Sequence, residues 1–138
     1  MPKIGVRLPA SFDSAGEFLA DAQALEAAGA ELLTLGEGDL EPAMLLAALA
    51  SVTTRIALHG AANETLRQLA RGRLALDLEG WVEEALPADR GAWRVRLAAH
   101  EEAGVAGVIV PMNPRLVDLL RNPDVEDDRA GDLQLAQG

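Results

Sequence analysis

The sequence contains no cysteine, so disulfides, thiolate nucleophiles and cysteine-based metal sites are excluded. Aromatic residues are also scarce: two tryptophans, two phenylalanines and no tyrosine occur among 138 residues. The core must therefore consist mainly of Leu, Val, Ile and Ala side chains, which are common in protein interiors. Small side chains of this kind favour a close approach of helices to a sheet over a large aromatic-lined pocket.

Positive charge is in short supply as well. The chain has 12 Lys and Arg residues against 22 Asp and Glu residues, a net charge of −10. Nucleic-acid backbones and anionic membrane surfaces attract basic residues, so neither partner is expected. The longest apolar run, residues 43–50, is far shorter than the roughly 20 residues of a membrane span, and the N-terminus does not resemble a signal peptide. We therefore expect a cytoplasmic protein whose acidic surface serves solubility.

Hydrophobic periodicity predicts strands that alternate with helices along the chain. Helix boundaries are marked by capping residues, with Asn63 at one start and Gly29, Gly72 and Gly104 at three ends. Strands are predicted over residues 3–9, 31–36, 55–59, 73–79 and 105–111. Residues 80–88 are predicted to be irregular, with a short extra strand over residues 81–86 as the alternative. We expect one domain over residues 1–122 and an acidic, extended C-terminal tail over residues 123–138.

The predicted strands have one apolar face and one face that is small or charged. In residues 73–79, for example, the apolar face carries Leu74, Leu76 and Leu78. The opposite face carries Arg73, Asp77 and Glu79. A parallel sheet covered by helices on both sides would be apolar nearly throughout. The pattern therefore predicts an α/β fold with a parallel (βα)5 sheet that resembles a truncated TIM barrel, with helices on the outer face.

A complete barrel needs eight such units and roughly 200 residues or more. A five-unit sheet would keep open edges, and open edges invite pairing with another chain. We therefore expect a homodimer formed through the open sheet or through its inner face.

Five segments along the chain form a recognisable series: Lys3-Ile-Gly-Val-Arg-Leu-Pro9, residues 24–29, residues 45–56, residues 65–74 and residues 103–111. Taken in this order, they resemble one family of barrel enzymes, the bacterial luciferase-like monooxygenases. Members of that family are flavin- and deazaflavin-dependent oxidoreductases with a TIM-barrel fold. The resemblance implies that FMN or a deazaflavin binds at the carboxyl-terminal ends of the strands.

His59 is the last residue of the third predicted strand, at the end where βα-barrel enzymes hold their catalytic groups. The resemblance implies a catalytic role for His59 and cofactor contacts from Arg7, Glu37, His59, Gly60 and Gly80. The alternative is a structural histidine that is hydrogen-bonded near a loop. No metal site is predicted, because His-rich ligand spacing is absent.

The segment around residues 76–81 departs from the family. Asp77 and Glu79 stand where the family has glycines close to the cofactor, and a carboxylate about 4 Å from a phosphate costs roughly 4 kcal/mol at an effective dielectric of 20. We predict that both pair with Arg7 and Arg73 in a buried salt-bridge network. The alternative is a carboxylate site for acid–base or metal chemistry.

The two tryptophans and the second histidine are predicted to be structural or surface residues. Trp81 and Trp93 are predicted to be core plugs that fill the end of the sheet, and the alternative is that they cover a ligand. His100 is predicted to be solvated on its helix. Because family members are longer, the resemblance also places a deletion of the middle of the barrel between Trp81 and Asp89.

Two hypotheses about function follow. The chain is either a shortened luciferase-like oxidoreductase, or a degenerate non-catalytic member that acts as a homodimeric or partner-binding module.

Overall fold

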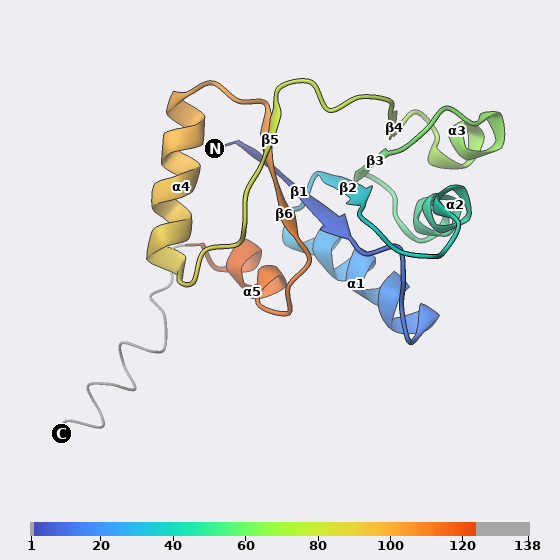
Figure 1. Ribbon diagram of the computed structural model, residues 1–138, viewed down its shortest axis with the longest axis horizontal. Helices are drawn as coiled ribbons and strands as arrows, with labels where there is room; N and C mark the ends of the chain where they lie inside the picture. The colour runs from blue at the N-terminus through green and yellow to red at the C-terminus, as the bar shows by residue number, and fades with distance from the viewer. Residues whose placement is uncertain (1, 124–138) are drawn as a thin grey trace.

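The computed structural model describes residues 2–123, in which six strands alternate with helices (Figure 1). The strands are β1 (Lys3–Leu8), β2 (Leu32–Leu35), β3 (Ala57–His59), β4 (Leu74–Ala75), β5 (Trp81–Glu83) and β6 (Gly107–Pro111). The helices are α1 (Ala15–Ala28), α2 (Pro42–Val52), α3 (Glu64–Ala70), α4 (Arg90–Glu102) and α5 (Leu116–Arg121). Apart from Pro123, the predicted C-terminal tail lies outside the described residues.

All six strands are parallel and form one sheet in the order β4-β3-β2-β1-β6-β5. The sheet curls into a half-barrel, and the helices follow its outer face, so the predicted fold class is confirmed. The sheet has one strand more than predicted, because Trp81–Glu83 forms β5 and pairs with β6. The irregular chain predicted for that stretch is therefore wrong there, and the short extra strand is correct.

The connection between β4 and β5 explains why the sheet must curl. These two strands are the opposite edges of the sheet, about 24 Å apart if six strands lay flat at about 4.8 Å spacing. The six peptide steps from Ala75 to Trp81 reach about 22 Å at most, and a turn in which Trp81 N donates to Leu78 O shortens them further. Figure 1 shows this segment arching between the two edges. The two strands are therefore joined without a helix by residues 76–80, whereas the resemblance places the deletion between Trp81 and Asp89.

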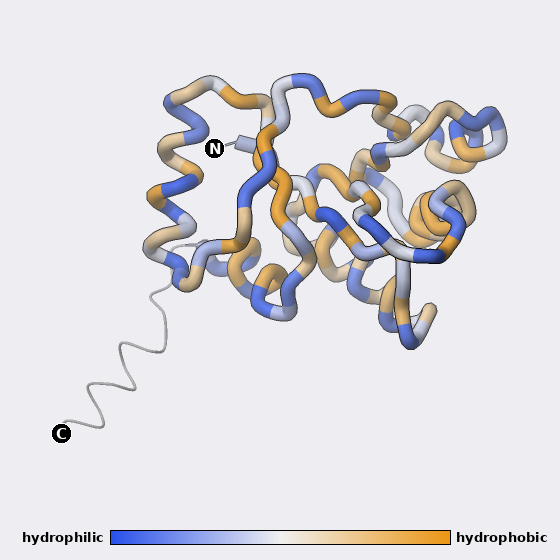
Figure 2. The backbone as a smooth tube through the Cα atoms, viewed as in Figure 1, coloured by the Kyte–Doolittle hydropathy of each residue, from blue (hydrophilic) through white to orange (hydrophobic). Residues whose placement is uncertain are grey.

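The outer face of the sheet carries the main core. Alternate strand residues point there and pack with the helices, and β6 is hydrophobic along most of its length in Figure 2. These residues are Ile4, Val6, Leu8, Leu33, Leu58, Val108 and Val110. Trp93 joins them from α4 with 2% of its surface exposed, as predicted for a core plug. The side of α4 that faces away from this core is hydrophilic, so blue and orange segments alternate along the helix in Figure 2.

Trp81 covers the middle of the inner face. A Cβ atom on Gly107 would lie 2.3 Å from Cζ3 of the indole, and one on Gly5 would lie 3.0 Å from the same atom. The indole therefore lies flat against two strands that carry no side chain at these positions. Leu32 and Ile109, which neighbour Gly5, are also buried on this face. The inner face thus has a small apolar core of its own.

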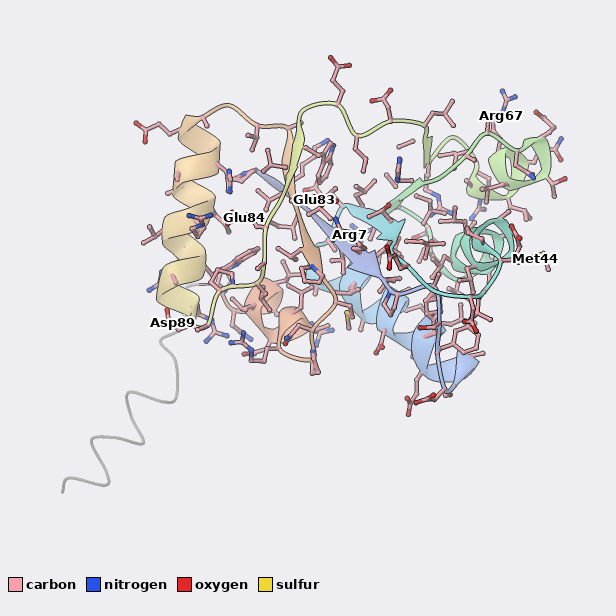
Figure 3. The ribbon with its side chains drawn as sticks, in the orientation of Figure 1. Arg7, Met44, Arg67, Glu83, Glu84 and Asp89 are labelled. Carbon is pink, nitrogen blue, oxygen red and sulfur yellow. The ribbon has the colours of Figure 1, made fainter. Side chains whose placement is uncertain are left out.

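The predicted salt-bridge network of Asp77 and Glu79 with Arg7 and Arg73 is wrong. Strand β4 ends at Ala75, so neither carboxylate lies on a strand, and Asp77 Oδ1 accepts a hydrogen bond from Glu79 N at 3.0 Å within a turn. Arg7 pairs instead with Glu83 of β5 across the inner face, where Figure 3 shows the two side chains together.

Arg73 turns away from the inner face and holds the carboxyl-terminal ends of two helices. Its guanidinium donates hydrogen bonds of 2.8–3.2 Å to Ala50 O, Thr53 O, Thr53 Oγ1, Ile56 O and Ala70 O. Burial, followed by the charge of Arg71, lowers the pKa of Arg73. Unpaired carbonyls at helix ends need such donors.

Glu26 of α1 binds backbone N–H groups of the loop after α2, as Arg73 binds carbonyl groups there. Its carboxylate accepts hydrogen bonds of 2.7–3.2 Å from the backbone N–H groups of Thr54, Arg55 and Ile56. Burial raises the pKa of Glu26, but these hydrogen bonds and the charge of Arg55 outweigh it, so the pKa lies below its usual value.

Glu84 joins the end of β5 to α4. It accepts a hydrogen bond of 2.6 Å from Arg96 Nε, and His100 Nε2 lies 3.6 Å from its Oε2. The Arg96 hydrogen bond lowers the pKa of Glu84, although burial opposes it. The His100 side chain is 20% exposed, so its predicted solvation is wrong, because this side of α4 packs on the end of β5.

Candidate functional site

A pocket of about 380 Å³ opens at the carboxyl-terminal ends of β2 and β3, between the starts of α2 and α3. Its size falls in the range of roughly 300–1,000 Å³ that is typical of small-molecule sites. Its position is the edge where parallel α/β folds place their ligands. The lining residues are Thr34, Leu35, Gly36, Glu41, Pro42, Ala43, Leu46, His59, Gly60, Ala61, Ala62, Asn63 and Leu66.

A hydrogen-bonded pair of Thr34 and His59 supplies the central polar groups of this pocket. Thr34 Oγ1 lies 2.8 Å from His59 Nδ1, and Thr34 is 6% exposed. The register explains the pairing, because Leu33 is opposite Leu58, so that the next residue of each strand points to the inner face. A buried hydroxyl needs an acceptor. We therefore assign the hydroxyl proton to the bond with Nδ1, which leaves the proton of neutral His59 on Nε2.

Close backbone packing shapes the pocket walls. A Cβ atom on Gly60 would lie 2.2 Å from Leu46 Cδ1, so a side chain there would displace the end of the Leu46 side chain. Gly36 lies against the aliphatic part of the Arg7 side chain, and a Cβ atom on Gly36 would lie 2.9 Å from Arg7 Cδ. The two glycines let the chain leave each strand without filling the space that the pocket occupies.

Capping residues at the two helix starts provide the remaining polar groups. Asn63 Oδ1 accepts from Leu66 N at 2.9 Å and caps α3, as its sequence position predicted. Glu41 caps α2 through a 3.4 Å contact from Ala43 N, and Pro42 occupies the first helical position. The Oδ1 bond of Asn63 leaves its amide NH₂ as the donor group of that side chain.

The structure brings together some of the predicted site residues and separates others. His59 and Gly60 line the pocket. Arg7 touches the pocket wall at Gly36 but pairs with Glu83. The Glu37 side chain is exposed in the loop after β2, outside the lining. Gly80 precedes β5, where its carbonyl accepts from Ala106 N at 2.8 Å, and so it lies at the amino-terminal edge, away from the pocket.

Sequence reasoning missed Thr34, Glu41 and Asn63 as parts of a site. Thr34 is the one polar residue in Leu32–Leu35, which was a usable signal. Glu41 and Asn63 precede helices, and their pattern indicates caps equally well. The shared edge of the sheet, and no spacing in the sequence, brings these three residues together.

The pocket fits the ring system of a flavin better than a flavin phosphate. Leu46, Leu66 and Pro42 provide apolar surface, while His59 and Asn63 provide hydrogen-bond donors. No lysine or arginine is among the described lining residues, and Glu41 adds a carboxylate. A phosphate is usually held by cations and free helix N–H groups. The described lining of this pocket has no Lys or Arg, and Ala43 N and Leu66 N at the two helix starts already donate to capping side chains.

The described part of the chain holds neither a candidate metal site nor a candidate membrane-spanning helix. Residues 2–123 hold no cluster of His, Asp and Glu arranged to bind a metal ion. Among the same residues, no helix is both long and apolar enough to cross a bilayer. Comparisons with protein-family models, curated proteins and solved structures found no match to this chain.

Proposed function

We propose that this chain is a cytoplasmic small-molecule-binding protein of the luciferase-like type, which binds the ring system of a flavin or deazaflavin in the pocket between β2 and β3. The observation that carries the proposal is the part-buried Thr34–His59 hydrogen bond, whose two residues line a pocket of about 380 Å³. Histidines at this edge of βα folds are well placed to meet a ligand. The order of family-like segments along the chain supports the choice of ligand.

The chain's own residues would bind and orient the ring. Thr34 fixes the tautomer and orientation of His59, whose Nε2–H then donates to a carbonyl oxygen or ring nitrogen of the ligand. Leu46 and Leu66 pack against the apolar part of the ring and exclude water from it. A bound flavin or deazaflavin would supply hydride-transfer chemistry. His59 is the group that can hold a proton beside it.

Binding of riboflavin is the direct test. We expect riboflavin to raise the melting temperature of the wild-type protein in proportion to RT ln(1 + [L]/Kd), because it binds the folded state. His59→Leu should remove most of this shift, and Thr34→Val should weaken binding by about fivefold, since one hydrogen bond is worth roughly 1 kcal/mol. The matched control is Thr65→Val, an exposed threonine on α3. Thermal-shift and fluorescence titrations measure both effects.

The proposal fails if riboflavin, FMN and a deazaflavin all leave the melting temperature and flavin fluorescence unchanged. It also fails if His59→Leu binds riboflavin as tightly as the wild type does while the fold is intact.

The second candidate is a degenerate, non-catalytic module that works as a homodimer. It is favoured by the two sheet edges at β4 and β5 and by Leu76, which is 62% exposed directly after β4. An exposed apolar residue beside an open edge is typical of a contact surface. We expect light scattering to give the mass of a dimer for the wild type and of a monomer for Leu76→Asp. A wild-type monomer at all concentrations up to 0.1 mM, on the order of a weak dimer's dissociation constant, would rule this candidate out.

A further inference from the structure

The charges around the pocket indicate what kind of flavin-like molecule it can accept. Glu41 and His59 are the ionisable residues among its lining, and Glu41, whose side chain is exposed, is the acidic one. The carboxylate stands at the start of α2, where a helix would otherwise attract an anion. Pro42 lacks an N–H group, and Ala43 N already donates to Glu41 Oε1. The amino-terminal end of α2 is thus occupied by the protein's own anion.

The cations nearest to the pocket already have carboxylate partners. Arg7, which touches Gly36, pairs with Glu83. Arg67 lines a smaller neighbouring cavity of about 190 Å³, and its Nη2 lies 2.8 Å from Glu64 Oε2. A phosphate beside either arginine would compete with the carboxylate that already pairs with it, and a phosphate at the start of α2 would face Glu41. Neutral ligands face neither cost.

We propose that the pocket selects uncharged heteroaromatic ligands over their phosphorylated forms, and that Glu41 is the residue that excludes the phosphate. This inference rests on the proposed function and narrows its ligand class. Riboflavin and FMN share the same ring and ribityl chain and differ by the terminal phosphate, so they form a matched pair of probes. The pocket binds riboflavin at least tenfold more tightly than FMN.

Glu41 variants test the cause of this selectivity. In Glu41→Gln the ratio of the two dissociation constants falls to threefold or less, mainly because FMN binds more tightly. Glu41→Ser gives the same result and keeps a good helix cap, so that loss of the cap is not mistaken for a change in charge. The matched control is Glu37→Gln, which removes one exposed carboxylate outside the lining and leaves the ratio at tenfold or more.

Fluorescence titrations with riboflavin and FMN at two salt concentrations complete the experiment. The ratio should shrink as salt rises, because ions screen the repulsion between Glu41 and the phosphate. Equal or tighter binding of FMN by the wild type overturns this inference and leaves the proposed function standing. An unchanged ratio in both Glu41 variants also overturns it. If neither flavin binds, the proposed function fails and the inference fails with it.

Discussion

Replacing Arg73 by methionine should lower the free energy of unfolding by about 3 kcal/mol, among the largest effects expected for a single polar side chain here. The guanidinium donates to Ala50, Thr53, Ile56 and Ala70, and the methionine would leave several of these carbonyl groups without a donor. The cost is large because the groups lie where α2 and α3 end against the sheet, and water can replace only the more exposed of the lost donors.

Arg73→Lys separates the charge from the shape of the side chain. Lysine keeps the positive charge but lacks the planar fork that reaches several carbonyls at once, so it should recover less than half of the lost stability. The matched control is Arg67→Met, which removes an exposed pair with Glu64 and should cost less than about 0.5 kcal/mol. Urea unfolding followed by circular dichroism measures all three variants. A loss below about 1 kcal/mol in Arg73→Met would contradict the capping role.

Adding one methyl group at Gly107 should cost about 2–3 kcal/mol, because the new Cβ would meet three atoms of the Trp81 indole at 2.3–2.6 Å. The same substitution should cost less than about 0.5 kcal/mol when Trp81 has first been replaced by alanine, since the obstacle is then gone. Urea unfolding of the four proteins in this double-mutant cycle gives the coupling between the two positions. Trp81 emission should also shift to longer wavelength in Gly107→Ala.

Gly16→Ala is the matched control for that substitution. Its Cβ would lie 3.8 Å from Ser14 Oγ, an ordinary contact, and the residue lies in α1. Alanine should therefore stabilise the protein by about 0.5–1 kcal/mol, as expected for glycine in a helix. If Gly107→Ala behaves like Gly16→Ala, the indole does not rest on β6 as described.

The pattern of residues predicted the fold class because each strand is exposed to a different environment on its two faces. In β1, Ile4, Val6 and Leu8 face the helices, while Gly5 and Arg7 face inward. That alternation, repeated in other strands, argued against a sheet covered on both sides. The local capping signal at Asn63 was equally reliable, because its side chain accepts a hydrogen bond from Leu66 N in the first turn of α3.

The predictions that failed concern partners distant in the chain. Residues 73–79 alternate like a strand, yet β4 stops at Ala75 because the chain must leave to reach the opposite edge of the sheet. Arg73 was expected to face a carboxylate, but it is drawn to the carbonyl groups at the helix ends. The carboxylate that Arg7 needs comes from β5, 76 residues further along the chain.

The sequence pointed to only part of the candidate site, because some of its residues come together only in the folded structure. His59 and Gly60 were found because the end of a strand is a local feature. Thr34 and Glu41 join them only through the parallel register of β2 and β3 and the packing of α2. No spacing in the sequence encodes that meeting.

The segment from Thr65 to Trp81 shows most clearly what each level decided. Its own residues determined a helix, a glycine stop and a second glycine before Trp81, because these depend on capping and backbone freedom. Only the tertiary structure decided that Arg73 caps two helices, that Asp77 and Glu79 lie in a turn, and that Trp81 covers Gly5 and Gly107. The reason is physical: caps and periodicity act over a few residues, whereas a side chain's partner depends on how the whole sheet curls.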